Sequence, residues 1–242
     1  MNKQGFFCKE STLSLYQNSS ADPREKENYA LEATPFRIGL VATLTWAFKL
    51  FMDLTVEGLE HFPHEGAVIV AANHVTNFDV FPMQISLPRP IFYMAKDSLF
   101  KNPIVAMALR SVGAFPVDRK LGSKDDWAMD HAREVLEHGL TLGMFPEGTR
   151  SRGEGLGLAK TGTARFAIEK QVPVLPMAII GSDTFFREFP KRNPVKVILC
   201  TPLNPDPGEE TLAFTDRIMF ALAANLPEEM RGVYADVPRG FG

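Results

Sequence analysis

Short apolar runs that alternate with longer amphipathic stretches constrain the fold of this chain more than any other feature. The apolar runs predict strands at residues 67–72, 91–95, 115–117, 141–145, 174–180 and 195–200. The amphipathic stretches predict helices at residues 78–87, 102–109, 125–137, 163–169 and 209–224. Strands that alternate with helices are typical of an α/β fold. We therefore predict a mixed, partly parallel central sheet covered by helices on both faces.

The composition changes along the chain and divides it into three segments. Residues 1–33 are polar and mixed in charge, without sustained periodicity, which predicts a flexible leader. Residues 34–54 are mostly apolar and predict an N-terminal helical segment. Residues 55–242 carry the alternating pattern and are numerous enough to bury one core, so we predict a single domain there.

The N-terminal helical segment is predicted to rest on a membrane surface. Eleven uncharged residues, Trp46 among them, lie between Arg37 and Lys49. A helix that spans a bilayer needs about twenty apolar residues, so this stretch is too short. Aromatic residues flanked by basic ones are typical of an interfacial helix. The alternative is a helix that packs on the core of the protein itself.

The overall composition opposes several classes of protein. A net charge of −3 opposes a general nucleic-acid binder. Cys8 and Cys200 provide neither a disulfide framework nor a zinc spacing, and no histidine or carboxylate cluster has metal-ligand spacing. We therefore predict no metal site and a reducing cytoplasmic setting. The leader lacks the apolar core of an export signal.

His74 and Asp79, separated by four residues, form the first candidate catalytic pair. His74 follows the carboxyl end of the predicted strand at 67–72. A helix is predicted next, so Asn77 can cap it and Asp79 lies in its first turn. The carboxylate can then bind one ring nitrogen and leave the other to accept a proton from an alcohol. This spacing alone is a weak signal, because histidines and aspartates are common enough to match by chance.

Residues 145–151, which read Phe-Pro-Glu-Gly-Thr-Arg-Ser, form a far more specific motif. They follow the predicted strand at 141–145, and ligands of open α/β sheets gather at the carboxyl ends of strands. Arg150 can make a forked contact with a phosphate, and Gly148 allows close backbone approach. Glu147 can hold a hydroxyl or orient the arginine. The alternative is a surface turn with a Glu–Arg ion pair.

Basic residues follow two other predicted strands. Lys96 follows the strand at 91–95, and Arg119 follows the strand at 115–117. Residues 89–120 contain six basic and two acidic residues, which favours an anionic ligand or an anionic membrane face. We therefore predict Arg119 as a second cation for the same phosphate, with Lys96 as a weaker candidate. The alternative is that these cations belong to an ordinary solvated surface.

Two rival chemistries are not supported by the motifs. The chain contains no Gly-x-Ser-x-Gly, so an acyl-enzyme is not expected. The glycine-rich run at 153–161 ends in Lys160-Thr161 and resembles a P-loop. However, Ala159 stands in place of the glycine before the lysine, and Glu154 in place of the first glycine, which opposes a nucleotide cradle.

Taken in order, these motifs resemble the blocks of the phospholipid-synthesis acyltransferase family, in particular its 1-acylglycerol-3-phosphate O-acyltransferase (lysophosphatidate acyltransferase) branch. The resemblance covers roughly residues 56–203. It runs through a series of matching segments: Val56-Glu-Gly-Leu-Glu, Asn73-His74 to Asp79, Lys96, 113–119, 145–151, Lys160-Thr-Gly162 and 172–176. The segment at 145–151 matches its block residue for residue.

The resemblance implies a role for each motif residue. His74 would be the general base on the free hydroxyl of the acceptor, and Asp79 its orienting partner. The glycerol phosphate would be held by loop residues, namely Arg119, Glu147 and Arg150, with Gly148 and Thr149 shaping the loop. The acyl donor would be a thioester of coenzyme A or acyl carrier protein, attacked directly and without a cofactor.

The resemblance also implies the surroundings of the protein. Residues 55–242 would be a catalytic domain of glycerolphosphate acyltransferase-like fold that makes phosphatidate from a lysophospholipid in phospholipid biosynthesis. It would act at the cytoplasmic face of the membrane, as a peripheral or monotopic protein. The positions between His74 and Asp79 tend to track the acceptor class, so an acyltransferase or transacylase on another lysolipid stays open. A separate alternative is a non-catalytic lipid-binding membrane protein of the same fold.

Overall fold

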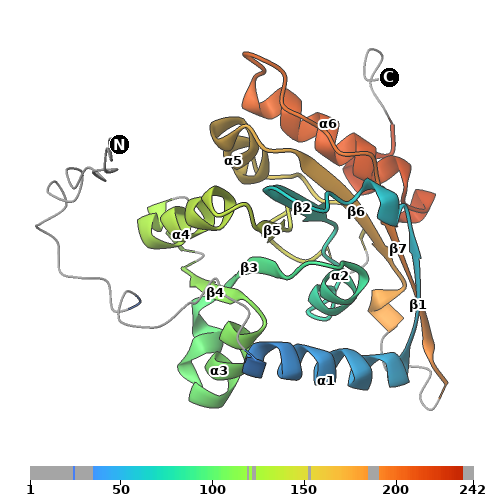
Figure 1. The fold of residues 1–242 in the computed structure, drawn as a ribbon. Helices are drawn as coiled ribbons and strands as arrows, with labels where there is room; N and C mark the ends of the chain where they lie inside the picture. The colour runs from blue at the N-terminus through green and yellow to red at the C-terminus, as the bar shows by residue number, and fades with distance from the viewer. Residues whose placement is uncertain are drawn as a thin grey trace, which may run out of the picture.

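The structure, a computed structural model, describes residues 24, 35–118, 120–121, 124–151, 154–184 and 191–236. The predicted leader, residues 1–33, lies outside the described residues except for Arg24. From residue 35 onward, the described chain builds a layered α/β body around one sheet (Figure 1).

A seven-stranded sheet forms the centre of the molecule (Figure 1). Its strands in chain order are β1 (Met52–Glu57), β2 (Val68–Ala72), β3 (Ile91–Lys96), β4 (Ala114–Val117), β5 (Thr141–Met144), β6 (Val174–Ile180) and β7 (Asn193–Leu199). Across the sheet they are ordered β1-β7-β6-β2-β5-β3-β4. Neighbouring strands are parallel, except that β6 and β7 are antiparallel. The prediction of a mixed, partly parallel sheet is therefore confirmed.

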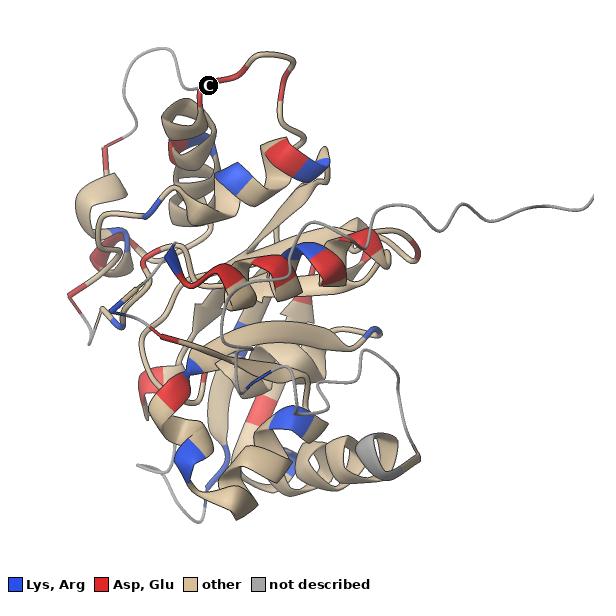
Figure 2. Cartoon of the chain, turned by 90° about the vertical axis from the view of Figure 1, so that its left-hand side faces the viewer, with Lys and Arg blue, Asp and Glu red and all other residues tan. Residues whose placement is uncertain are grey.

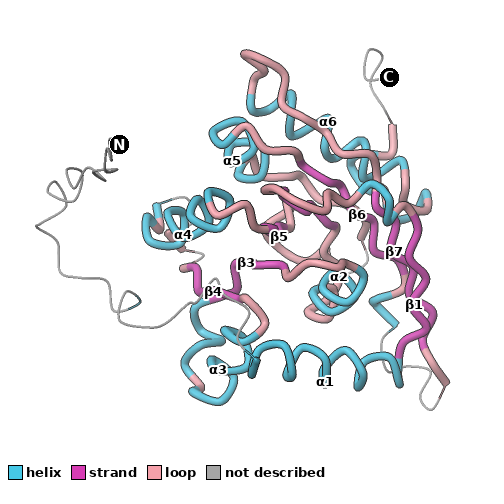
Figure 3. Tube along the Cα trace, viewed as in Figure 1, coloured by secondary structure: helices cyan, strands magenta, loops and turns pink. Residues whose placement is uncertain are grey.

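Helices cover both faces of this sheet (Figure 3). One face carries α1 (Pro35–Phe51), α2 (Val80–Ser86) and α3 (Pro103–Ser111). The other face carries α4 (Asp126–Glu137), α5 (Gly162–Lys170) and α6 (Thr211–Ala224). Within β2, Val70 belongs to the core under the first group and Ile69 to the core under the second. Side chains of a strand alternate between faces, so a strand buried on both faces reads as a continuous apolar run.

The structure differs from the predicted elements in two places. Strand β1 was not predicted; its burial alternates strictly, and polar residues (Asp53, Thr55 and Glu57) occupy its exposed positions, so it has no continuous apolar run. The helix α1 accordingly ends at Phe51 rather than at residue 54. The predicted cap at Asn77 was wrong, because α2 begins at Val80 with Asp79 as its N-cap residue. The Asp79 side chain makes no capping bond, since its carboxylate binds elsewhere.

Helix α1 packs on the protein with one face and exposes apolar side chains on the other. Phe48 stacks on Phe81 of α2, with ring centroids 3.7 Å apart. Ile38 and Trp46 point outward, with 58% and 65% of their surfaces exposed. None of the described helices is long and apolar enough to cross a membrane. The alternative of a helix packed on the core therefore holds for the inner face of α1, whereas membrane contact of its exposed outer face stays a prediction.

The loops that carry the predicted motifs emerge at one edge of the sheet. Strands β2, β5, β3 and β4 are consecutive and parallel. The register pairs Ala71 with Met144 and Lys96 with Val117, close to the carboxyl end of each strand. Segments that follow β2 and β5 therefore leave the sheet side by side. This edge is where ligands of open parallel sheets bind.

Candidate active site

His74 is placed by the residue before it. The Asn73 side chain extends the ladder of the sheet, because its amide nitrogen donates to Ile179 O at 2.8 Å and its Oδ1 accepts from Ile179 N at 2.7 Å. This pair of bonds fixes the turn that leaves β2 against β6. His74, which is 8% exposed, then lines a cavity at the edge of the sheet.

The Asp79 carboxylate organises the turn around the His74 ring. Its Oδ2 accepts the Nδ1 hydrogen of His74 at 2.8 Å, and also the backbone N–H groups of Val75 at 2.6 Å and Thr76 at 2.8 Å. Its Oδ1 accepts from the Thr76 hydroxyl at 3.1 Å. An ionised carboxylate only accepts hydrogen bonds, so Nδ1 carries the proton and Nε2 is left as the proton acceptor. This tautomer is the one that a general base requires.

The loop after β5 closes on the other side of the histidine. The Phe145 ring stacks on the imidazole, with centroids 4.1 Å apart and an interplanar angle of 20°. Ser151 N donates to His74 O at 2.8 Å, so both ends of residues 145–151 contact the histidine. The structure thus brings the His74–Asp79 pair and the motif at residues 145–151 into direct contact.

Glu147 belongs to this loop, and its side chain is buried, with 3% of the residue exposed. Its Oε1 accepts the backbone N–H of His74 at 3.0 Å, and its Oε2 accepts that of Gly157 at 2.9 Å. Burial raises the pKa of the Glu147 carboxyl, and the two backbone donors partly offset that effect. Both oxygens therefore bind the protein's own backbone. The expectation that Glu147 contacts substrate or orients an arginine stays a prediction.

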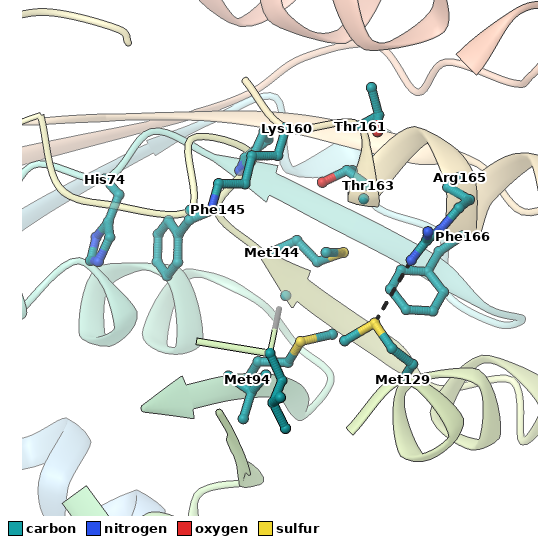
Figure 4. A pocket seen from close by; sticks show the side chains of 16 residues that line it. His74, Met94, Met129, Met144, Phe145, Lys160, Thr161, Thr163, Arg165 and Phe166 are labelled. Atoms are coloured by element: carbon teal, nitrogen blue, oxygen red, sulfur yellow. Dashed lines mark hydrogen bonds between the residues drawn. The ribbon is translucent and has the colours of Figure 1, made fainter. Parts of the chain in front are cut away.

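A cavity of about 510 Å³ opens beside the histidine. Figure 4 shows His74 and Phe145 at one end and Arg165 and Phe166 at the other, with methionines between them. One wall is apolar and consists of Met94, Val117, Leu121, Met129, Met144 and Phe166. The polar wall consists of Gly148, Lys160, Thr161, Gly162, Thr163 and Arg165. In Figure 4, Lys160, Thr161 and Thr163 lie across the cavity from Met94 and Met129, whereas Arg165 contacts Met129. Such a cavity can hold an alkyl chain along one wall and anionic groups along the other.

Lys160 is a cavity residue that the motif analysis did not assign to the site. Its backbone N–H donates to Pro146 O at 2.8 Å, which ties it to the loop after β5. Its side chain crosses Gly148, where an added Cβ would lie 3.0 Å from Lys160 Cδ and Cε. Gly148 also has a φ of 66°, which favours glycine. The sequence signal for Lys160 was the Lys160-Thr-Gly162 segment, which resembles a segment of the family but was not given a function from the sequence.

The remaining predicted phosphate ligands lie outside the cavity wall or outside the described chain. Thr149 and Arg150 are exposed at the tip of the loop after β5. Lys96 ends β3 and is also exposed. Arg119 is not among the described residues. Within the described ranges, no group of histidine, cysteine and acidic side chains has the geometry to hold a metal ion.

The residue before Arg119 is held by a buried aspartate. Asp125, which is 1% exposed, accepts the Asp118 N–H at 2.7 Å and caps α4 through Ala128 N at 3.3 Å. Arg24 makes a forked contact with the same carboxylate, at 2.7 and 2.8 Å. Burial acts to raise the pKa of Asp125, but the Arg24 bonds and the backbone donors outweigh it and lower the pKa. The loop between β4 and α4 therefore starts from a fixed point.

The chain is similar in sequence to known acyltransferases. The family model described as Acyltransferase matches residues 53–180. A 1-acyl-sn-glycerol-3-phosphate acyltransferase of Bacillus subtilis is 31% identical over 177 residues, which cover 69% of this chain and 86% of that protein. A protein of the same name from Borreliella burgdorferi is 30% identical over 135 residues and 56% of this chain. The alignment covers 54% of that relative, so the chain spans about half its length.

A solved structure shares the fold. The 1-acyl-sn-glycerophosphate (LPA) acyltransferase PlsC of Thermotoga maritima superposes with a TM-score of 0.64 at 23% identity, covering 83% of this chain and 81% of that one. A mixed sheet between two layers of helices defines an α/β protein, and a histidine–aspartate pair lies at the carboxyl ends of its strands. The chain belongs to the acyltransferase family.

Proposed function

We propose that this protein transfers a fatty acyl group from a thioester to the free hydroxyl of 1-acylglycerol-3-phosphate, which gives phosphatidate. The observation that carries the proposal is the bond of 2.8 Å between His74 Nδ1 and the Asp79 carboxylate at the wall of the cavity. The names of the relatives from Bacillus subtilis and Borreliella burgdorferi support the choice of acceptor.

The chemistry is a direct displacement. His74 Nε2 accepts the proton of the acceptor hydroxyl as its oxygen forms a bond to the thioester carbonyl carbon. The tetrahedral intermediate collapses, the C–S bond breaks, and the proton passes from His74 to the departing thiolate. Asp79 keeps the ring in the required tautomer and stabilises the imidazolium that forms in between. Because no serine or cysteine nucleophile is involved, no acyl-enzyme forms.

The substrates are assigned to the site by their chemistry. The apolar wall of methionines, valine, leucine and phenylalanine suits an acyl chain, and methionine adapts to flexible chains. Arg150 and Arg119 are proposed to bind the acceptor phosphate, with Lys96 as a further cation. The donor is proposed to be a coenzyme A or acyl carrier protein thioester.

The membrane surface is proposed as the place where the acceptor is met. Both acceptor and product carry acyl chains and partition into lipid, so a catalytic domain without a spanning helix among its described residues needs an interfacial contact. The outer face of α1 offers Ile38, Trp46 and Leu50 for that contact. A setting at the cytoplasmic face, as a peripheral or monotopic protein, belongs to this proposal.

A lysolipid panel tests the proposal. Purified protein is given labelled palmitoyl-coenzyme A or palmitoyl-acyl carrier protein with lysophosphatidate, glycerol 3-phosphate or a headgroup-bearing lysolipid, and products are separated by headgroup. We expect labelled phosphatidate as the main product, and its absence in the His74→Ala chain. A main product with a capped headgroup would replace the acceptor assignment, and no product from any pair would favour a lipid-binding protein.

A further inference from the structure

The polar wall of the cavity is the amino-terminal end of helix α5. Lys160, Thr161, Gly162 and Thr163 all line the cavity. Thr161 is the N-cap residue, and its side chain makes no capping hydrogen bond. The first backbone bond of the helix runs from Arg165 N to Thr161 O at 2.9 Å, so the N–H groups of the preceding residues have no intrahelical acceptor. A helix end of this kind attracts an anion through these donors and the helix dipole.

The Thr163 hydroxyl is a second and independent sign of a ligand. Thr163 is 2% exposed, and its Oγ1 has no hydrogen-bond partner in the described part of the protein. In Figure 4 this oxygen points toward the side of the cavity on which Lys160 lies. A buried hydroxyl without a hydrogen-bond partner lowers the stability of the fold, so such a group indicates a position where a bound ligand supplies the missing hydrogen bond.

The charge around this helix end has one sign. Lys160 extends over Gly148 into the cavity, and Arg165 lies at the far end of the same wall. Among the described residues that line the cavity, none is aspartate or glutamate. Within the described part of the chain, the Arg165 guanidinium has one hydrogen-bond partner, Met129 Sδ at 3.9 Å. A thioether sulfur is a weak acceptor. A cationic wall without a carboxylate suits a group with several anionic oxygens.

We propose that the amino-terminal end of α5, together with Lys160 and Thr163, binds a phosphate group of a substrate. The backbone N–H groups of Gly162 and Thr163 and the Thr163 hydroxyl donate to its oxygens, and the Lys160 ammonium neutralises its charge. These donors line the cavity whereas Arg150 does not, and the proposal rests on the proposed function in that both substrates of that reaction carry phosphate. The phosphate belongs either to the donor thioester or to the acceptor.

Direct binding tests the site without turnover. Inorganic phosphate is titrated calorimetrically into the full chain carrying Arg150→Ala, so that the Arg150 contact does not contribute. Adding Thr163→Val should weaken phosphate binding about tenfold, as expected for one lost hydrogen bond to a charged group. Adding Lys160→Gln should weaken it at least as much. Absence of phosphate binding in the Arg150→Ala chain, or equal affinity in all variants, would overturn the proposal.

Matched substitutions supply the controls. Thr141 is also buried and also has an unpartnered hydroxyl, but it lies at the start of β5 and does not line the cavity. Thr141→Val therefore removes the same group from an equally buried place, and it should leave phosphate binding unchanged. Lys191→Gln removes one exposed positive charge away from the cavity and should do the same. If Thr141→Val weakens binding as Thr163→Val does, the effect is structural and the site is refuted.

Steady-state kinetics then identify which substrate supplies the phosphate. Thr163→Val is compared with the unchanged protein on palmitoyl-coenzyme A and on palmitoyl-N-acetylcysteamine, which has no phosphate, and on lysophosphatidate and monoacylglycerol. If the site binds the donor, the KM for palmitoyl-coenzyme A rises and that for the phosphate-free thioester does not. If it binds the acceptor, the same difference separates the two acceptors. Equal losses of Thr163→Val with every substrate would overturn the proposal. If the protein without substitutions binds phosphate but transfers no acyl group, that result would count against the proposed function alone.

Discussion

The carboxylate of Glu147 holds the backbone of His74, with 3.0 Å between Glu147 Oε1 and His74 N. Its other oxygen holds Gly157 N at 2.9 Å, so one buried side chain joins the loops after β2 and β5 to the segment that leads into α5. Tyr234 supports the same segment, because its hydroxyl accepts Ala159 N at 3.1 Å. Glu147 thereby holds both His74 and the segment that leads into the cavity wall.

Glu147→Gln should lower kcat more than it raises the acceptor KM. The amide would turn one N–H group toward a backbone N–H, so one of the two buried bonds is lost and His74 shifts. The loss of a buried bond of this kind costs about 1–3 kcal/mol of unfolding free energy. Denaturant unfolding and steady-state kinetics measure the two effects. Glu57→Gln, at an exposed surface pair, is the control, and a variant with normal kcat would show that Glu147 does not position the base.

His74→Ala should nearly abolish transfer, because general-base assistance contributes about 10²–10⁴-fold. Asp79→Asn should lower kcat while leaving acceptor binding largely intact, since the amide can no longer accept from every donor that now points at Oδ2. Rates of purified variants, free of host enzyme, measure both. Turnover of His74→Ala near that of the unchanged protein would refute the assignment of the base.

Most of the sheet was predictable because its inner strands, such as β2 and β6, are buried on both faces. A short continuous apolar run, such as the one that forms β6 (Val174–Ile180), indicates a buried strand, and its predicted and observed bounds coincide. Strand β1 lies at the edge of the sheet, where one half of its side chains face solvent, and therefore carries no such run. Local pattern alone does not separate such a strand from a loop or from the end of α1.

The contact between the two catalytic candidates was predictable, but the architecture around them was only partly so. The His74–Asp79 pair follows from spacing at a strand-to-helix turn, and the structure forms that contact. The role of Glu147 does not follow from sequence, because a glutamate beside an arginine reads as a surface ion pair or a ligand. Its partners are backbone groups of His74 and Gly157, which no residue pattern encodes. Lys160 was likewise missed because its approach to Gly148 depends on how two loops fold together.

Arg150→Ala should raise the KM for lysophosphatidate and cost about 2–4 kcal/mol of transition-state binding, if the guanidinium grips phosphate. The same change should barely affect monoacylglycerol, which has no phosphate. The side chain is exposed, so the substitution should leave the unfolding free energy nearly unchanged. Steady-state kinetics with the two acceptors measure the difference, and equal losses would mean that Arg150 shapes the loop instead.

His131 should make the protein less stable as the pH falls. Its ring packs between Trp127, at 5.2 Å, and Phe115, at 4.7 Å, and burial lowers its pKa from 6.5 despite the nearby Glu134. Below about that pH the unfolded chain binds a proton that the folded protein does not, so stability is lost as the pH falls toward the folded pKa. Each unit of lowering corresponds to about 1.4 kcal/mol.

Denaturant unfolding between about pH 7 and pH 5 measures this dependence of the unfolding free energy on pH. The slope should be smaller in His131→Gln than in the unchanged protein. His64→Gln, at an exposed histidine outside α4, should retain the slope of the unchanged protein. A slope in His131→Gln as steep as that of the control would assign the acid sensitivity to another group.

The outer face of α1 should decide binding to anionic vesicles. Neither α1 nor α3 contains an acidic residue, and Figure 2 shows both helices without red segments. Trp46 is the test residue, because Phe48 stacks on Phe81 and its removal would destabilise the fold. Burial of one large apolar side chain contributes about 1.5–3 kcal/mol to the free energy of membrane binding. Trp46→Ser should therefore weaken vesicle binding at least about tenfold.

Leu212→Ser is the matched control for Trp46→Ser, since Leu212 is 63% exposed on α6, across the sheet from α1. Sedimentation with phosphatidylglycerol vesicles measures binding, and activity on vesicle-borne lysophosphatidate should fall with it. Activity on a short-chain soluble acceptor should remain, because the catalytic pair is untouched. If Trp46→Ser sediments like the unchanged protein, or if Leu212→Ser releases it equally, α1 is not the membrane contact, and the basic end of β3 becomes the next surface to test.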